Sequence, residues 1–231
     1  MKKIYTYGAA QKLYSPFKKL ESKFDIHLKA GNYYILRFDG KEMTAGFKIK
    51  HQAINDMFFK TMRESFYNFV DTFKKTLFAY SFSDEISILF KSKKTDDDFS
   101  RSEKLLSLLS SQLTLNFYKS AIKYNLDLKN KDWLFDARIL EVTKEDTLSY
   151  FQARQAFAID KYLTQLKGQY GIDYKLHKSD DIIEALKLKG VEYSKLNPEY
   201  AYGIMYSNKT SINPFEFAED PTKLRLACFG T

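Results

Sequence analysis

Cysteine and histidine are scarce in this chain of 231 residues, which has one Cys and three His. The single thiol, Cys228, cannot form an internal disulfide. The histidines (His27, His51 and His177) are scattered along the sequence. These numbers argue against a disulfide framework and against a zinc site, which needs several clustered Cys or His ligands. We therefore expect a cytoplasmic protein.

Long hydrophobic runs are also lacking. The chain starts Met-Lys-Lys-Ile-Tyr with no apolar stretch behind it, so we expect no signal peptide. No window approaches the roughly 18 apolar residues of a membrane span, so no membrane partner is expected. The P-loop pattern G-x-x-x-x-G-K-[ST] does not occur either, and we find no internal repeat or low-complexity block.

Size and charge are more informative. A mass of 27.1 kDa with 44% hydrophobic residues suits one large domain, or one domain with an appendage. The net charge is +8 and the isoelectric point about 9.2. A basic surface favours a polyanionic partner such as RNA, DNA or a nucleotide, although a merely soluble basic surface would have the same composition.

Hydrophobic periodicity predicts the main elements. We expect a strand at 33–38, a helix at 51–73, a β-hairpin at 77–90, a helix from Ser100 and a strand at 134–142. In the second helix, Ser100-Arg101-Ser102-Glu103 fits a capping box. Its expected apolar face consists of Leu106, Leu109, Leu113, Phe117 and Ala121.

This order predicts an α+β fold with a ferredoxin-like βαββαβ palm core, in which the helices cover one face of an antiparallel sheet. We place the core and its lead-in at 1–145. A C-terminal helical or irregular extension at 146–231 would pack on it as a single structural unit. The extension should contain helices at 148–167 and 180–189, a late strand at 200–206 and an irregular tail, with breaks at Gly168, Gly171 and Gly190.

Acidic residues stand where this topology brings two strands together. Asp39 ends the first strand, and Ser83-Asp84-Glu85 forms the hairpin turn, so Asp39 and Asp84 should meet in space. Two carboxylates so placed can hold a pair of hard divalent cations, which bridge phosphates in nucleotidyl transfer. Turn acids are also common at strand ends, so a purely structural role stays open. Glu85 either ligates as well or points outward.

Several other residues are candidates for binding phosphate or RNA. Gly40 allows close backbone approach, and residues 41–44 offer backbone N–H groups. Arg101 and Lys104 lie in the first turn of the second helix, where phosphate is attracted, although a solvated helix start explains them equally well. Lys50 also faces phosphate or is plain surface. The same alternatives apply to Arg154-Gln155, which opens a late helix. For Asp136 and Arg138 an internal ion pair is the simpler interpretation.

Several of these stretches together resemble a known family. They are Arg37-Phe38-Asp39-Gly40-Lys41, the segment from Ala79 to Phe90 (A-Y-S-F-S-D-E-I-S-I-L-F), Phe99 to Ser107 (F-S-R-S-E-K-L-L-S), Phe135-Asp136-Ala137-Arg138 and Arg154-Gln155-Ala156. Over about residues 1–206 the chain resembles the tRNA-His guanylyltransferase superfamily, and more closely its guanylyltransferase-like branch of 3′–5′ reverse polymerases.

The resemblance implies a nucleotidyltransferase with a palm-like core, usually a homotetramer. It implies two Mg²⁺ ions bound by Asp39, Asp84 and the Gly40 carbonyl. It also implies ATP, GTP or other nucleoside triphosphates as substrates and tRNA as partner. By this resemblance the nucleotide-binding residues are Asp39, Gly40, Lys41, Glu42, Met43, Thr44, Lys50, Ser83, Asp84, Arg101, Lys104 and Ser107, and the RNA-binding residues are Arg154 and Gln155.

The departures from the family pattern narrow the prediction. The family element H-I-N-N is replaced by Ile159-Asp160-Lys161-Tyr162, the motif K-P-x-D lacks its proline after Lys50, and Lys41 replaces an arginine. The loss of H-I-N-N favours template-dependent repair of 5′-truncated tRNA over addition of a guanosine to histidine tRNA. Three alternatives stay open: the histidine-tRNA enzyme itself, a palm-type nucleotidyl cyclase, and an RNA-binding protein whose catalysis has lapsed.

Overall fold

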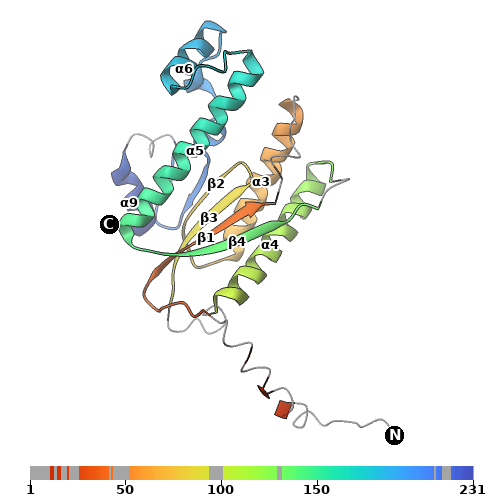
Figure 1. The fold of residues 1–231 in the computed structure, drawn as a ribbon, viewed down its shortest axis with the longest axis vertical. Helices are drawn as coiled ribbons and strands as arrows, with labels where there is room; N and C mark the ends of the chain where they lie inside the picture. The colour runs from red at the N-terminus through yellow and green to blue at the C-terminus, as the bar shows by residue number, and fades with distance from the viewer. Residues whose placement is uncertain are drawn as a thin grey trace.

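The computed structural model describes residues 11–12, 15–16, 20, 26–41, 43, 52–93, 101–128, 132–210, 212–214 and 220–230. Within them, one antiparallel sheet has the strand order β4-β1-β3-β2-β5. The strands are β1 (Tyr33–Gly40), β2 (Thr76–Phe82), β3 (Glu85–Lys91), β4 (Phe135–Val142) and β5 (Ile204–Ser207). Helix α3 (Gln52–Thr72) follows β1, and helix α4 (Ser102–Lys123) follows β3 (Figure 1). The predicted βαββαβ core is therefore confirmed.

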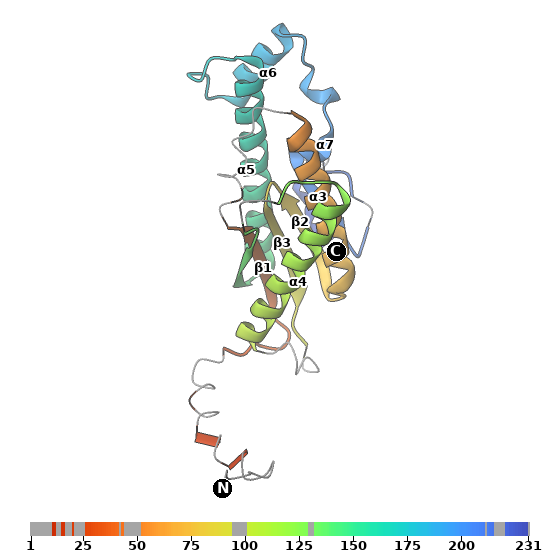
Figure 2. The same cartoon turned by 90° about the vertical axis from the view of Figure 1, so that its right-hand side faces the viewer.

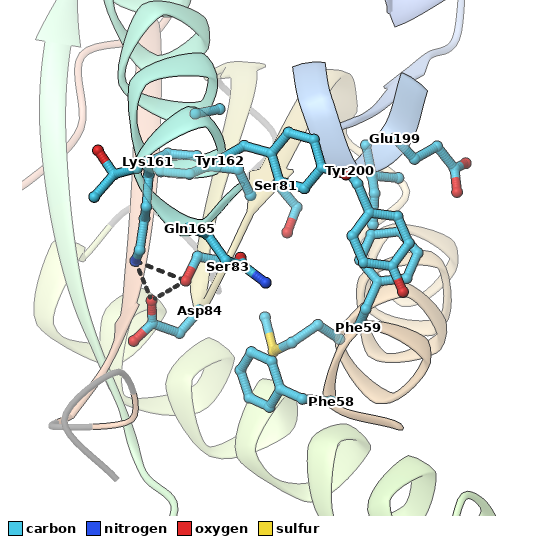
Figure 3. Close-up of a pocket in the computed structure, with 15 residues that line it drawn as sticks. Phe58, Phe59, Ser81, Ser83, Asp84, Lys161, Tyr162, Gln165, Glu199 and Tyr200 are labelled. Atoms are coloured by element: carbon cyan, nitrogen blue, oxygen red, sulfur yellow. Dashed lines mark hydrogen bonds and ion pairs between the residues drawn. The ribbon is translucent and has the colours of Figure 1, made fainter. Parts of the chain in front are cut away.

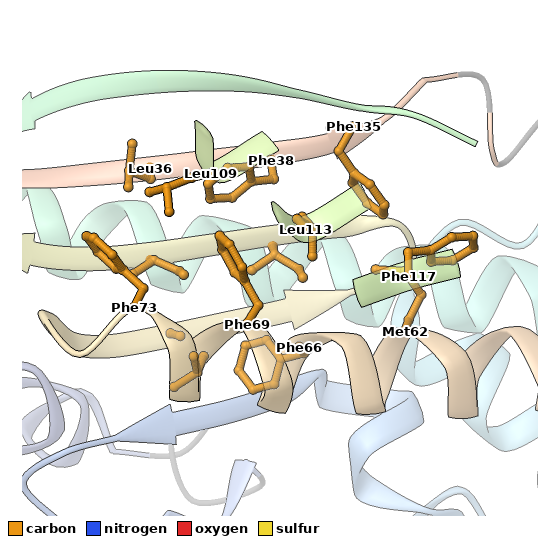
Figure 4. Close-up of a cluster of buried hydrophobic side chains, with 14 of the residues drawn as sticks. Leu36, Phe38, Met62, Phe66, Phe69, Phe73, Leu109, Leu113, Phe117 and Phe135 are labelled. Atoms are coloured by element: carbon orange, nitrogen blue, oxygen red, sulfur yellow. The ribbon is translucent and has the colours of Figure 1, made fainter. Parts of the chain in front are cut away.

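One face of the sheet packs against α3 and α4. Side chains alternate between the two faces of a strand, so Tyr34, Leu36 and Phe38 of β1 point to this same face. All three belong to one cluster of buried hydrophobic residues there. They meet the apolar faces of the two helices, as in the edge-on contact between the rings of Phe38 and Phe69 (Figure 4). The predicted apolar periodicity of α3 is thus the reason that this helix lies on the sheet.

The opposite face is covered as well, which the prediction of helices on one face did not include. Helices α5 (Lys144–Tyr170) and α9 (Pro221–Phe229) pack there, so the sheet is sandwiched between two helical layers (Figure 2). The expectation of an irregular tail is wrong at 221–229, because Asp220 accepts the Thr222 amide and Pro221 takes the first helical position. The division of the chain near residue 145 stays a prediction.

Helix α5 is longer than predicted and continues past the sheet (Figure 1). A capping box between Thr143 and Asp146 starts it, and it ends only at Gly171, whose φ of 61° suits glycine. Gly168 therefore lies inside the helix and does not break it. No described helix in this chain is long and apolar enough to cross a membrane.

Smaller elements pack around the far end of α5. Helix α6 (Ser179–Leu188) joins it in a separate apolar cluster. A 3₁₀ turn, η3 (Tyr193–Lys195), and helix α7 (Pro198–Tyr202) then lead back to the sheet. The late strand was predicted from residue 200. It begins only at Ile204, because Asn197 caps α7 through the Glu199 amide.

The start of α4 differs from the predicted capping box. Its N-cap is Arg101, not Ser100, and no side chain caps the helix. Instead, the Ser102 amide donates to the Ile26 carbonyl at 2.9 Å, which satisfies one of the free amides of the first turn. The buried face includes Leu105, whereas the predicted Leu106 is only partly buried.

Gly203 allows a prediction about this packing. Its φ is +85°, and a Cβ there would lie 2.6 Å from the Tyr80 ring, whose hydroxyl donates to the Tyr202 carbonyl. We expect Gly203→Ala to lower the free energy of unfolding by roughly 3 kcal/mol, from backbone strain plus overpacking. Gly190→Ala is the control: its φ is +81° but nothing lies within 4 Å. It should cost only about 1 kcal/mol. Equal urea midpoints for the two variants would contradict the packing argument.

Candidate active site

The end of β1 and the β2–β3 turn lie side by side. Asp39 pairs with Glu85 in the register of β1 and β3, and the Gly40 amide donates to the Asp84 carbonyl at 3.0 Å. The expectation that Asp39 and Asp84 would be neighbours is therefore confirmed. Their role as metal ligands stays a prediction.

The turn itself has only two residues, Ser83 and Asp84, because Phe82 already pairs with Glu85. Ser83 has a φ of 53°, which short hairpin turns need and L-residues rarely adopt. Its hydroxyl donates to the Asp84 carboxylate at 2.9 Å, and the Asp84 residue is only 6% exposed. The turn thus holds the Asp84 carboxylate in one orientation against the body of the protein.

Gly40 is packed so closely that a side chain on it would force its neighbours to shift. A Cβ there would lie 2.4 Å from the Met43 sulfur and 3.0 Å from the Asp84 Cβ. The Gly40 backbone therefore lies directly against Asp84. Two carboxylates and a nearby backbone carbonyl are the oxygen donors that Mg²⁺ prefers, so the residues fit such an ion. Among the described residues, no three His, Cys, Asp or Glu side chains gather as a metal-binding group.

Beside these acids lies a charge cluster that we call the Glu85 cluster: the buried Glu85 and the partly buried Arg37 and Arg154. The Glu85 carboxylate is ion-paired with Arg37 of β1 at 3.2 Å and with Arg154 of α5. Arg37 also donates to Asp39 at 3.0 Å. Burial raises the pKa of Glu85, and the two guanidinium groups oppose this. The alternative that Glu85 points outward is wrong, since it faces α5 inside the protein.

Lys161 reaches the β2–β3 turn from α5, the helix that also carries Arg154. Its ammonium donates to the Ser83 hydroxyl at 2.7 Å and lies 3.6 Å from an Asp84 carboxylate oxygen (Figure 3). In the sequence, position 161 stands out only as part of the altered H-I-N-N element. A helical signal was available, because Lys161 follows Arg154 by seven residues and so lies on the same face of α5.

A cavity of about 320 Å³ opens beside Ser83, Asp84 and Lys161. Aromatic side chains form much of its wall, and Phe59 of α3 stacks on Tyr200 of α7 at 3.8 Å between ring centroids (Figure 3). The Tyr200 hydroxyl donates to Asp56 at 2.8 Å. The cavity therefore combines aromatic walls with charged groups, a combination typical of sites for small ligands.

Other predicted nucleotide-binding residues lie elsewhere. Arg101 forms a β-bridge with His27, and the Ser92 amide donates to the Asn32 carbonyl. The start of α4, with Lys104 and Ser107, is therefore at the end of the sheet where β1 begins. The chain's own Asp39 and Asp84 are at the opposite end, so this structure does not bring the two groups together.

The segment after Gly40 is only partly described. The Lys41 amide donates to the Leu134 carbonyl at 2.8 Å, so it is not the free phosphate donor that we predicted. The Met43 side chain is fully buried in the core. Glu42, Thr44 and Lys50 lie outside the described residues.

Arg154 and Gln155 lie in the middle of α5, not at the start of a helix as predicted. Arg154 is held by Glu85, and Gln155 is 6% exposed and donates to the Pro214 carbonyl at 3.0 Å. RNA contact by these two residues stays a prediction. The expected pairing of Asp136 with Arg138 is present at 4.0 Å, on an exposed part of β4.

Comparison with known proteins decides the family. The model of the Thg1 family, tRNAHis guanylyltransferase, matches residues 14–143, more than half of the chain. The chain belongs to this family. It is therefore a nucleotidyltransferase that acts on tRNA. A comparison with curated protein sequences found no match.

Solved structures of Thg1 proteins share the fold. A bacterial Thg1-like protein in complex with ATP superposes with a TM-score of 0.71 at 20% identity, covering 95% of this chain and 100% of that one. A bacterial Thg1-like protein in complex with GTP gives a TM-score of 0.68 at 20% identity, covering 94% of this chain and 99% of that one. The tRNA(His) guanylyltransferase from Saccharomyces cerevisiae gives 0.68 at 22%, covering 83% and 93%. The palm-like Thg1 fold thus includes the part of this chain beyond the family match.

The contacts of the Glu85 cluster allow a prediction about the stability of the protein. Glu85→Ala leaves two guanidinium groups without their shared carboxylate in a poorly solvated site. We expect a loss of about 3–5 kcal/mol in the free energy of unfolding, measured by urea denaturation. Glu141→Ala is the control, because Glu141 pairs with Lys29 on the surface. That change should leave the urea midpoint almost unmoved, because exposed ion pairs contribute little to stability. A Glu85→Ala variant as stable as Glu141→Ala would show that the cluster does not hold α5 to the sheet.

Proposed function

We propose that this Thg1-family chain is a magnesium-dependent 3′–5′ nucleotidyltransferase that repairs 5′-truncated tRNA in a template-dependent manner. The observation that carries the proposal is the convergence of Asp39, Gly40 and Asp84 at one end of the sheet, beside a cavity with aromatic walls. A tRNA 5′ end and a nucleoside triphosphate are the reactants that family membership implies for such a site.

Asp39, Asp84 and the Gly40 carbonyl would hold the two Mg²⁺ ions. When bound, such ions activate an attacking hydroxyl and stabilise the charge on a leaving phosphate. The protein's own part is orientation: the β1–β3 register and the short turn keep the two acids together, and the Glu85 cluster holds Asp39 through Arg37.

In the proposed reaction, the 3′-hydroxyl of the incoming nucleotide forms a bond to the 5′ phosphorus of the RNA. The leaving group is AMP when ATP has first activated a 5′-monophosphate, and pyrophosphate when the RNA carries a 5′-triphosphate. The bacterial Thg1-like structures with ATP and with GTP support both nucleotides as substrates here.

The stretch from Ile159 to Tyr162 supports repair over histidine-tRNA guanylylation. It replaces the H-I-N-N element, and Lys161 from this stretch contacts the Asp84 turn. Altered side chains next to Asp39 and Asp84 would contact the reacting groups. We therefore expect them to alter how strongly the reaction depends on a template.

The test uses a tRNA that lacks one 5′ nucleotide and bears a 5′-monophosphate, with Mg²⁺, ATP and each labelled nucleoside triphosphate. We expect incorporation of the nucleotide complementary to the opposing base. Asp39→Asn and Asp84→Asn should each slow it by about 100-fold or more, as losing one oriented charged group in an active site does. Asp71→Asn, on the exposed end of α3, should leave it unchanged.

Each other result points to a different function. Guanosine addition regardless of the opposing base would indicate a histidine-tRNA guanylyltransferase. A cyclic or oligomeric product from ATP or GTP alone would indicate a nucleotidyl cyclase or synthase. Binding of tRNA without any incorporation, also with a 5′-triphosphate, would indicate a lapsed enzyme. Full activity of Asp84→Asn would remove Asp84 from the proposed metal site.

A further inference from the structure

Lys161 is placed to do more than neutralise Asp84. Its side chain is 44% exposed and lines the cavity, while its ammonium contacts both residues of the β2–β3 turn. The contact with Ser83 is a hydrogen bond at 2.7 Å, and the contact with Asp84 is a looser ion pair at 3.6 Å. The ammonium is therefore not held by a tight bidentate pair.

A divalent cation on Asp84 would change this arrangement. Two positive groups a few ångströms apart repel one another, so Lys161 would lose its attraction to the carboxylate. The flexible four-carbon stem of lysine lets the ammonium move to a new partner. Glu199, the other acid on the cavity wall, is already paired with Arg63 at 2.7 Å. An anionic group brought into the cavity by a ligand is then the favoured partner.

The cavity suits a nucleotide oriented in one way. Phe58, Phe59, Tyr162 and Tyr200 supply aromatic surface for a base, and Gln165 supplies an amide that can both donate and accept. Ser83, Asp84 and Lys161 line the side of the cavity opposite Phe59 and Tyr200 (Figure 3). A base stacked on the aromatic side would direct its phosphates toward Ser83, Asp84 and Lys161.

We propose that Lys161 is a phosphate-binding residue of this active site. It shields Asp84 in the free protein and binds a reactant phosphate once a divalent cation occupies Asp84. The inference rests on the proposed function, because that function supplies the cation and the phosphate. Two sources of the phosphate share this chemistry: a nucleoside triphosphate and the 5′-phosphate of the RNA.

Equilibrium binding tests the inference without turnover. The affinities of the full chain for ATP and for adenosine are measured in Mg²⁺ without RNA. The same measurement is then made for an RNA hairpin with a 5′-monophosphate and for the same hairpin with a 5′-hydroxyl. Lys161→Gln should reduce the gain in affinity that phosphate provides by about tenfold, since one charge-assisted hydrogen bond is worth at least that much. Lys161→Arg should restore most of it.

The control is Lys119→Gln, which removes the same charge from an exposed position on α4 outside the cavity lining. It should weaken binding of ATP and adenosine, or of both hairpins, by one equal factor or not at all. Matching thermal midpoints for the Lys161 variants and the wild type show that the fold is kept.

The outcomes separate the two proposals. A loss confined to the ATP pair assigns the phosphate to the nucleotide, and a loss confined to the hairpin pair assigns it to the RNA. If Lys161→Gln keeps the full phosphate-dependent gain in both pairs, the inference is wrong and Lys161 only shields Asp84. If the wild-type protein binds neither ATP nor RNA, the proposed function fails first and this inference fails with it.

Discussion

The buried carboxylate of Glu85 joins the sheet to helix α5, and the geometry of the site depends on this contact. Arg37 comes from β1 and Arg154 from α5, and both guanidinium groups meet the same carboxylate. Arg154 also lies against the rings of Phe82 and Phe157. A carboxylate between two arginines is stable in a poorly solvated place only while all partners are present. The cluster therefore fixes the position of α5 along its own axis relative to the sheet.

This axial position of α5 determines which of its side chains reach the β2–β3 turn. Seven residues, about two helical turns, separate Arg154 from Lys161, so the two side chains leave the same face of α5. Fixing Arg154 over Glu85 places Lys161 over Ser83 and Asp84. Tyr150, four residues before Arg154, shares a hydrogen bond of 2.8 Å with Ser87. One helix face thus carries a row of polar contacts that runs from the middle of the sheet to the end that holds Asp39 and Asp84.

The fold of the core could be predicted because its signals are local. The repeat of apolar residues in α3 and the alternation in the strands each lie within one segment, and the element order then favours one topology. The same topology predicted that Asp39 and Asp84 would be neighbours. The sequence predicted that a C-terminal helical extension would pack on the core, but not that it would cover the second face of the sheet. Helix α9 was missed because it is short and its pattern has meaning only against the sheet.

The side-chain partners at the site were harder to predict for a related reason. Arg154 and Glu85 are 69 positions apart, and Lys161 and Ser83 are 78 apart. Such pairs depend on the rotation and axial position of α5, which no local pattern reports. Likewise, Arg101 and Lys104 are good phosphate binders by their place in a helix, but the antiparallel course of β3 carries that helix start to the far end of the sheet.

The two-residue β2–β3 turn has a consequence for how the sequence can vary. Hairpin tips are usually the places where chains accept insertions and deletions with little harm. Here the tip connects strands whose side chains alternate between a core and a charged cluster. One residue more or fewer before Glu85 would turn its carboxylate toward the apolar core and move Asp84 away from Gly40. Sequences that keep this chemistry should therefore vary in length at other loops, while the spacing from Phe82 to Glu85 stays constant.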